Sequence, residues 1–229
     1  MKNVTPRNSG LIRDSRAWLE YASELGLTFI PSAGGPLEPG ESPGEGCEAC
    51  PLRGERQGVF SPWGSSRPRL VFVSAMPPPP MEEGEYSPFT GEEGRQLEKI
   101  MQAAADEAVL GISDMALTFA AKCIMPPHTG TEPQVLERAY RACARLLRGE
   151  ILELSPSVVV AMGAEATMAL TGLSDLKAAR GRLHEFSGEA GPGGIQVMPT
   201  YGLKELLVQK TLKRPVWDDI QLAIKALKN

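Results

Sequence analysis

Short hydrophobic runs alternate along the chain with longer stretches in which hydrophobic residues recur every three or four positions. The short runs, rich in β-branched residues, predict four strands at Arg69–Ser74, Met115–Ala121, Ser157–Met162 and Ile195–Pro199. The longer stretches predict helices at Glu92–Leu110, Pro133–Leu154, Gly163–Leu170, Lys204–Leu212 and Pro215–Leu227. Strands that alternate with helices indicate an α/β domain around a central, mainly parallel, four-stranded sheet.

The first forty residues have a different pattern. Leu11–Leu27 has a helical stripe of hydrophobic residues, and 31–46 is rich in Pro, Gly and Ser with too few apolar residues to pack. We therefore expect residues 1–40 to form a helical extension and linker. Residues 41–229 should form the main domain.

Composition narrows the class of protein. A chain of 229 residues can bury one sizeable core, and no hydrophobic run is long enough to cross a bilayer. The N-terminus lacks the apolar segment of a secretory signal, so we expect a cytoplasmic protein with no membrane partner. We also expect it to be a monomer. A net charge of −4 argues against bulk, non-specific binding to nucleic acid, although a local basic face is compatible with it.

Four cysteines are the candidate chemistry. Cys47 and Cys50 form a CxxC turn, Cys123 follows the second predicted strand, and Cys143 lies in the long helix after it. In a cytosolic chain such thiols are metal ligands or inert core residues more often than disulfides. Two ligands from a turn and two from later elements can converge on one tetrahedral site. Four thiolates suit either Zn²⁺ or a [4Fe–4S] cluster.

The cysteines belong to a longer ordered set of motifs. CPLR begins at Cys50, PF-x-G-x-x-G-x-x-L at Pro88 and KC-x-x-PP at Lys122, and SPSVVVAMGAEA follows from Ser155. Arg180–Gly181 and the PTY segment at 199–201 come later. Over residues 47–225 this order resembles the bacterial and archaeal uracil-DNA glycosylases that carry a [4Fe–4S] cluster.

The resemblance implies a fold, a cofactor and a partner. The fold would be the three-layer α/β fold of uracil-DNA glycosylases, with DNA as the partner and base-excision repair as the setting. The cluster would be structural and held by Cys47, Cys50, Cys123 and Cys143. If the chain is an enzyme, it would hydrolyse the N-glycosyl bond of a base flipped out of the stack.

Three motif positions depart from that family. The acidic residue of its G-E-A-P-G motif is Ala75 here, the amide of T-N-x-x-K-C is Phe119, and the histidine of P-T-x-H-P is Gly202. These groups would assist water, read the base edge and stabilise the leaving base. A phenyl ring can neither donate nor accept the hydrogen bonds by which uracil is recognised. Ordinary uracil excision is therefore not expected, and catalytic residues are not assigned.

Other residues are candidates for a base pocket. Phe89 matches the aromatic residue on which a flipped base would stack, although a core phenylalanine is the alternative. The predicted pocket comprises Ser74, Met76, Pro77, Phe89, Phe119 and Tyr201. Replacement acids exist at Glu82, Glu83 and Glu85, with a solvated loop as the alternative.

A basic stripe follows the helix around Cys143. Arg138, Arg141, Arg145 and Arg148 are spaced to share one helical face. They predict contacts with DNA phosphates, to which Lys204, Lys210, Lys213 and Arg214 would add charge. A solvated surface stripe is the alternative.

Three functional hypotheses follow. The chain is a glycosylase with a changed substrate, a catalytically silent paralogue that binds nucleic acid or a partner, or a protein whose cluster has a redox or sensing role. Turnover on damaged bases separates the first from the others, and salt-dependent DNA binding separates the second from the third.

Overall fold

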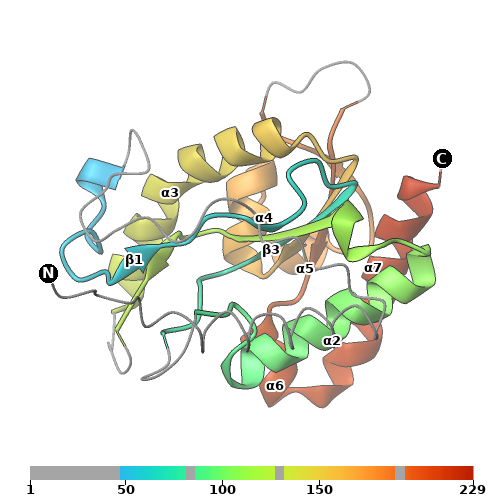
Figure 1. The fold of residues 1–229 in the computed structure, drawn as a ribbon, viewed down its shortest axis with the longest axis horizontal. Coiled ribbons are helices and arrows are strands. Elements are labelled where there is room, and N and C mark those ends of the chain that lie inside the picture. The colour runs from blue at the N-terminus through green and yellow to red at the C-terminus, as the bar shows by residue number, and fades with distance from the viewer. Residues whose placement is uncertain (1–46, 81–85, 127–131, 189–193, 229) are drawn as a thin grey trace, which may run out of the picture.

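Four parallel strands form the centre of the structure, a computed structural model that describes residues 47–80, 86–126, 132–188 and 194–228 (Figure 1). Their order across the sheet is β4 (Met115–Phe119), β3 (Leu70–Ser74), β6 (Val158–Met162) and β8 (Gln196–Thr200). These are the strands predicted from the hydrophobic runs, and the mainly parallel α/β architecture is confirmed. The predicted N-terminal extension and the acids at 82, 83 and 85 lie outside the described residues.

The sheet is larger than predicted. β2 (Trp63–Gly64) adds to β4 and β7 (His184–Glu185) adds to β8, both antiparallel, so the sheet has six strands and the prediction of four was wrong. Each added strand is two residues long, too short to produce a hydrophobic alternation. A separate two-stranded ribbon pairs β1 (Gly58–Val59) with β5 (Cys123–Ile124).

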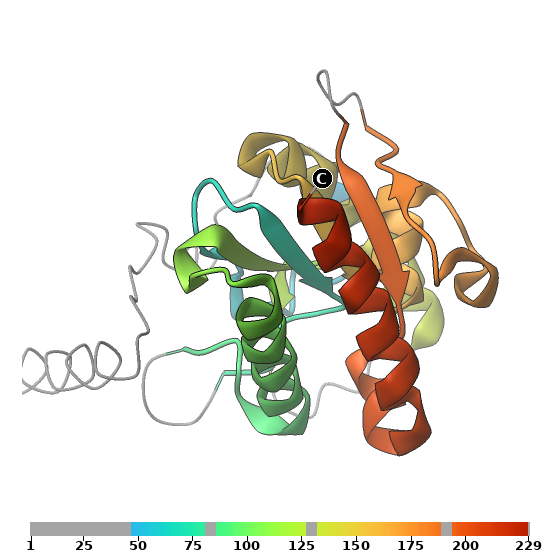
Figure 2. The ribbon, with the colours of Figure 1, turned by 90° about the vertical axis from the view of Figure 1, so that its right-hand side faces the viewer.

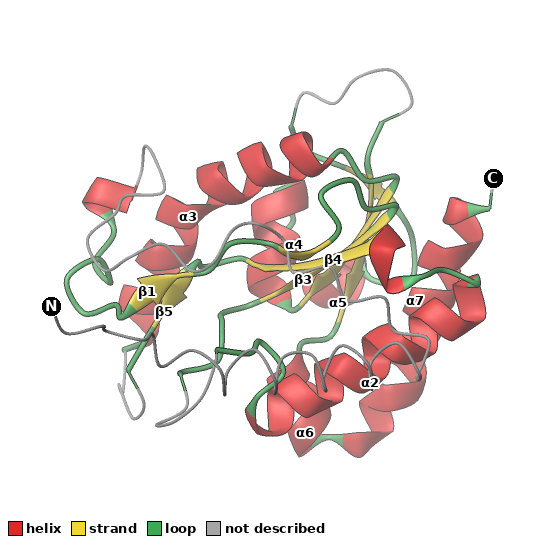
Figure 3. Ribbon diagram, viewed as in Figure 1, coloured by secondary structure: helices red, strands yellow, loops and turns green. Residues whose placement is uncertain are grey.

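Helices cover both faces of the sheet, as the edge-on view in Figure 2 and the colouring of Figure 3 make clear. One face carries α2 (Gly91–Ala108), α6 (Leu203–Val208) and α7 (Lys213–Leu227), and the other carries α3 (Pro133–Leu154) and α4 (Ala164–Thr171). The remaining helical segments are short: η1 (Cys47–Ala49), η2 (Ile112–Asp114), α5 (Leu176–Ala179) and η3 (Lys210–Leu212). Within the described ranges, none of the helices combines the length and apolarity needed to cross a membrane.

The two helical layers explain why the strands are hydrophobic without alternation. In β3, Leu70 and Phe72 pack with the α2 and α7 layer, whereas Val71 and Val73 pack with the α3 and α4 layer. All four side chains are fully buried. A parallel sheet covered on both faces needs apolar residues at every position. Each such side chain contributes about 1.5–3 kcal/mol of burial free energy.

Two helices end earlier than the hydrophobic pattern predicts. α2 ends at Ala108 because Val109 adopts a left-handed conformation with φ of 55° and is 89% exposed. The predicted helix over 204–212 divides into α6 and η3 at Gln209. α3 has its predicted limits, since Pro133 occupies the first turn and Ser155 turns left-handed at φ of 47°.

Candidate functional site

The carboxyl ends of the four central strands lie along one edge of the sheet, the position at which open α/β sheets bind ligands. Backbone hydrogen bonds hold the first two altered motifs together there. The Ala120 N–H donates to the Ser74 carbonyl at 2.7 Å, and the Ala121 N–H donates to the Ala75 carbonyl at 2.9 Å. The segments after β3 and β4 are therefore fixed side by side.

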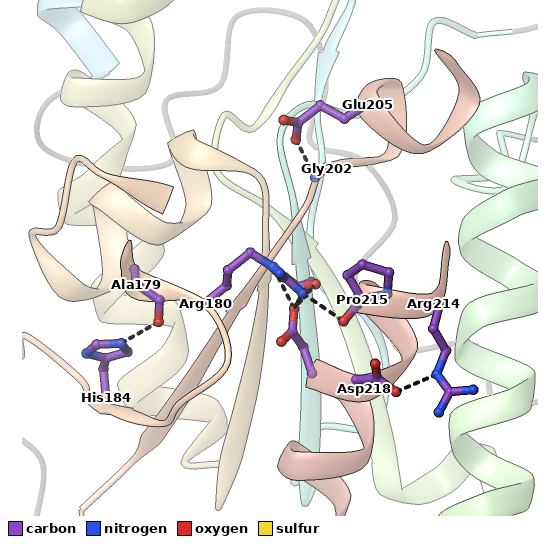
Figure 4. A network of polar contacts seen from close by, with 10 residues as sticks. Ala179, Arg180, His184, Gly202, Glu205, Arg214, Pro215 and Asp218 are labelled. Atoms are coloured by element: carbon purple, nitrogen blue, oxygen red, sulfur yellow. Dashed lines mark hydrogen bonds and ion pairs between the residues drawn. The ribbon is translucent and has the colours of Figure 1, made fainter. Parts of the chain in front are cut away.

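The third altered motif lies at the same edge, where Gly202 precedes α6. Its N–H donates to Oε2 of Glu205 at 2.8 Å, as Figure 4 shows. A Cβ built on Gly202 would lie 3.4 Å from the Cα of Gly163, which follows β6. The two glycines let the loops after β6 and β8 approach each other closely. No side chain extends from this position toward the site.

Phe119 is buried rather than open to a ligand. Its side chain is 2% exposed, and its ring meets Phe60 edge to face with 4.7 Å between the ring centres. Tyr86 contacts the same Phe60 ring at 6.1 Å. Phe119 thus closes the end of β4 with an aromatic core and offers no hydrogen bond to a base.

The other predicted pocket residues have different surroundings. Ser74 and Pro77 are buried, whereas Met76 is half-buried and packs against the group that contains Cys50 and Cys123. Phe89 is half-buried and meets Trp63 edge to face at 4.9 Å. Met76 is therefore directed to the thiols, while Phe89 is partly accessible.

Tyr201, also half-buried, belongs to a network that fixes the end of β8. The Arg180 guanidinium lies 4.4 Å from the centre of the Tyr201 ring, a cation–π contact. Arg180 donates through Nε and Nη2 to Oδ2 of Asp219, at 3.0 and 2.6 Å, and to the Pro215 carbonyl at 2.8 Å (Figure 4). Thr200 donates to the same Asp219 oxygen at 2.7 Å.

Sequence reasoning missed Asp219, which is 2% exposed. Burial raises the pKa of its carboxyl, and the hydrogen bonds from Thr200 and Arg180 oppose that rise. The signal was present in the helical pattern, because Asp219 shares a face with the buried Val216, Ile220 and Ala223. A buried carboxylate on such a face needs a cationic partner.

Carboxylates that the sequence analysis did not single out also lie at this edge. Glu93, in the first turn of α2, is half-buried; burial raises its pKa and the charge of Lys204 opposes the rise. A Cβ on Gly163 would lie 3.1 Å from Oε2 of Glu165. Burial, and then the charges of Glu165 and Glu93, raise the pKa of Tyr140. In the sequence these acids have the ordinary pattern of a helix N-terminus, which hides any other role.

The four cysteines lie together behind this edge. All four are buried and none forms a disulfide. Cys50 and Cys123 pack in one cluster, and burial, then the charges of Cys143 and Cys50, raise the pKa of Cys123 to about 12 against the opposing charge of Arg56. Within the described ranges, no three His, Cys, Asp or Glu side chains are already arranged to hold a metal ion.

Nitrogen donors surround the thiols. Nη1 of the buried Arg56 donates to Sγ of Cys47 at 2.7 Å, and Arg56 also hydrogen-bonds Cys123. Burial raises the pKa of Cys143, and a hydrogen bond from the backbone N–H of Lys122 opposes the rise. Such donors favour anionic sulfur. The donor set, four thiols with N–H groups directed at them, therefore fits a thiolate-ligated metal centre.

The side chain of Lys122 is itself fully buried. Its ammonium contacts the carboxylate of Glu150 and the hydroxyl of Thr118. Burial lowers the pKa of Lys122, and the Glu150 charge opposes this. Beside this pair, a groove of about 630 Å³ separates residues 59–66 from the second half of α3, with Arg145 and Glu153 in its lining. None of the predicted base-pocket residues lines this groove.

The predicted basic stripe is exposed along most of its length. Arg138, Arg141 and Arg145 are exposed on α3, and Arg141 pairs with Glu137 at 2.6 Å. Arg148 instead donates to the Ala169 carbonyl at 2.7 Å and joins α3 to α4. Three of the four arginines are thus placed to meet a ligand.

A second basic surface follows the carboxyl edge. Its cations Lys204, Lys210, Lys213 and Arg214 are exposed, and Val208 between them is 82% exposed. Arg214 pairs with Asp218 at 2.8 Å (Figure 4). The charge of Lys204 opposes the rise in the pKa of Glu93, which indicates that the two side chains are neighbours.

Comparison with known proteins agrees with this arrangement. The family model described as the uracil DNA glycosylase superfamily matches residues 61–221. The chain is also 30% identical, over 184 residues, to the type-4 uracil-DNA glycosylase of Thermotoga maritima, an alignment that covers 80% of this chain and 90% of that relative. The family match includes the carboxyl ends of the four central strands. This chain belongs to the uracil-DNA glycosylase superfamily.

Proposed function

We propose that this chain is an iron–sulfur protein that recognises a damaged base in DNA other than uracil. The observation that carries the proposal is the burial of Phe119 against Phe60 at the place where the family has a base-reading amide. An aromatic core at that position cannot pair with the polar edge of uracil. The site therefore lacks the polar group that would select uracil.

Two further groups needed for uracil excision are missing. Ala75 has no carboxylate to place water, and Gly202 has no imidazole to stabilise the departing base. Losing one well-placed electrostatic donor typically costs about 10² to 10³ in rate. The combined deficit should reach several powers of ten, although such losses are not additive.

A flipped base would still find aromatic surfaces. Phe89 is half-buried against Trp63, and Tyr201 is held by Arg180. Aromatic faces stack with any base, so they support binding without selecting uracil. Glu93 is a half-buried acid of this edge, and its raised pKa suits a group that holds or delivers a proton.

Cys47, Cys50, Cys123 and Cys143 would hold the cluster. When bound, a [4Fe–4S] group supplies a structural cross-link between the CxxC turn, β5 and α3. The ribbon of β1 and β5 supports this role, because Val59 pairs with Cys123 and ties the turn to that strand. Met76 packs against the same group, so the site also supports the first altered motif.

DNA is the proposed partner. The exposed arginines Arg138, Arg141 and Arg145 on α3 and the exposed cations around Lys204 support this proposal. Phosphate contacts of this kind position a protein without reading sequence. Base choice would then rest with the half-buried aromatic residues Phe89 and Tyr201.

The decisive test is base release. Anaerobically purified protein is incubated with duplexes and single strands that carry deaminated, oxidised or alkylated bases, and free base is measured. Release of a base other than uracil supports the proposal. The Phe89→Ala variant should release that base more slowly. Uracil release at the rate of an intact family member would overturn it.

A catalytically silent paralogue that binds nucleic acid or a partner is the second candidate. The close contact of Gly163 with Gly202 favours it, because neither of these two positions carries a side chain that could act on a base. Salt-dependent DNA binding with no release of any base would identify this function.

A further inference from the structure

We propose that Arg56 is a positioning residue for the cluster, whose charge and hydrogen bonding to the cysteine sulfurs favour the more reduced state of the centre. The inference rests on the proposed cluster. It extends that proposal to a residue that ligates nothing and has no part in base recognition.

The geometry around Arg56 carries the inference. Its Nη1 lies 2.7 Å from Sγ of Cys47, and it also hydrogen-bonds Cys123. The side chain is only 8% exposed. Cys47 comes from the CxxC turn and Cys123 from β5, so one planar guanidinium joins ligands from two separate elements. A guanidinium suits this role because its donors form a rigid fork.

The backbone fixes the approach of this side chain. Arg56 lies two residues before β1, and the N–H of the intervening Gln57 donates to the Ile124 carbonyl at 2.8 Å. Val59 then pairs with Cys123. The ladder that holds the ligand strand therefore also sets the position from which Arg56 reaches the sulfurs. Its contact with Cys47 spans nine residues and does not follow from the CxxC spacing.

The chemistry of the centre explains why a cation is useful here. A guanidinium stays charged in proteins, and burying it is costly unless anionic partners compensate. Four thiolates on an iron–sulfur core give a net negative charge, which grows by one unit on reduction. Hydrogen bonds to sulfur and nearby positive charge are known determinants of cluster potential. Arg56 should thus stabilise the reduced state more than the oxidised one.

Lys122 does not duplicate this arrangement. Its charge also acts on Cys143, but its ammonium has a carboxylate partner in Glu150. The contact of Lys122 with sulfur is made by its backbone N–H. A side-chain substitution at Lys122 would disturb a buried ion pair, whereas substitution at Arg56 changes the donors directed at Cys47 and Cys123.

The test compares Arg56→Gln and Arg56→Lys with the parent protein and with Arg53→Gln. Arg53 is exposed in the turn that precedes Arg56, so its substitution controls for the loss of one positive charge. Each protein is purified without oxygen, its iron and sulfide are measured, and its midpoint potential is determined by titration followed by electron paramagnetic resonance. Loss of iron to a chelator gives a second readout that needs no enzymatic activity.

The Arg56→Gln variant should favour the oxidised over the reduced cluster by about tenfold more than the parent, a one-electron shift of about 59 mV to lower potential. It should also lose iron several-fold faster. Arg56→Lys keeps the charge, so its midpoint potential and its rate of iron loss should lie between those of the parent and of Arg56→Gln. This variant still tests the inference if Arg56→Gln fails to fold. Potentials and iron loss equal to those of the Arg53→Gln control would overturn the inference. A parent protein that binds zinc or no metal would instead overturn the proposed cluster, and the inference with it.

Discussion

The rings of Phe60 and Phe119 meet edge to face with their centres 4.7 Å apart. Phe60 follows β1 and Phe119 ends β4, so the pair connects the ribbon beside the thiols with the edge of the main sheet. The Phe60 N–H donates to the Lys122 carbonyl at 2.8 Å, which fixes this position. Phe119 is therefore part of the packing that supports the thiol site.

This packing sets the first prediction, for Phe119→Asn. Replacing a buried phenylalanine by a small residue costs about 3–5 kcal/mol, and the asparagine amide would add a polar group to an apolar core. We expect a large fall in the urea midpoint of Phe119→Asn. The midpoint of Phe119→Leu should fall clearly less. Equal stability of Phe119→Asn and the parent would mean that the site is open to solvent.

The second prediction concerns uracil itself. The unaltered protein should release no detectable uracil from single- or double-stranded DNA under multiple turnover. Restoring Ala75→Glu, Phe119→Asn and Gly202→His together should recover at most a trace, because the amide disturbs packing. The histidine fits the backbone, since Gly202 has φ of −76° and a Cβ there makes ordinary contacts at 3.4 Å. Rapid uracil release by the parent would assign the chemistry to another acid of the edge, most directly Glu93.

The third prediction uses two neighbouring aspartates. Asp219 is 2% exposed and accepts from Arg180 and Thr200, whereas Asp218 is half-exposed and pairs with Arg214. Removing one partner of a buried ion pair typically costs about 3–5 kcal/mol, and an exposed pair contributes about 0–1 kcal/mol. Asp219→Ala should therefore lower the melting temperature by about 6 °C or more, since 1 kcal/mol corresponds to about 2–4 °C at this size. Asp218→Ala should change it little, and similar losses in both variants would contradict the assigned network.

Much of the fold could be predicted because the four central strands are five-residue hydrophobic runs. The limits of α3 were also readable, from Pro133 at its start and the break at Ser155. β1, β2, β5 and β7 were missed because two residues carry no periodicity. Their existence depends on pairing with distant segments.

The candidate site was only partly predictable for a related reason. The motifs named Ala75, Phe119 and Gly202, and the strand order then places all three at one edge. The partners of these motifs come from distant parts of the chain. Asp219 meets Arg180 across 39 residues. The helical pattern places Asp219 on a buried face, but it does not indicate which cation Asp219 meets.

The fourth prediction tests the proposed metal centre. Anaerobic protein should be brown and contain about four iron and four sulfide per chain. Cys143→Ser keeps the size of the side chain but weakens a ligand, so iron content and folded yield should both fall sharply. Colourless parent protein with one zinc per chain would contradict the cluster.

The fifth prediction separates a DNA-binding face from a solvated stripe. Replacing Arg138, Arg141 and Arg145 with alanine should weaken binding to any duplex and lower the salt slope by up to about 3. The matched control removes three exposed charges at the opposite edge of the sheet, Arg67, Lys225 and Lys228. That position follows from Arg69, at the start of β3, which donates to the Leu227 carbonyl at 2.8 Å. Equal losses of affinity in both variants would mean that the stripe acts only through the net charge of the protein.

The α3 stripe is not expected to act as three equal charges. Arg141 already pairs with Glu137, and Arg145 lies at the groove beside Glu150 and Glu153. Arg138 should therefore give the largest single effect on affinity. An Arg141→Ala variant that matched the triple variant would contradict this order.

Glu93 offers a pH-dependent test of the carboxyl edge. Burial raises the pKa of this carboxyl in the folded state above its unfolded value of about 4.3, and Lys204 only partly opposes this. For an acid with a raised folded pKa, ionisation costs stability, so the native state loses stability as pH rises from the unfolded pKa through the folded one. Glu93→Gln should therefore be more stable than the parent at pH 7, and the difference should shrink as the pH falls toward 4. Thermal melts at both pH values measure this difference in stability. The exposed neighbour serves as the control for one lost charge, in the variant Glu92→Gln.

A carboxylate that costs stability suggests a functional role. Any base release found in the panel should therefore fall by about 10² to 10⁴ in Glu93→Gln, the usual contribution of a general acid or base. If Glu93→Gln is less stable than the parent at pH 7, the carboxylate is held by Lys204 as a structural ion pair, and its role in proton transfer is withdrawn.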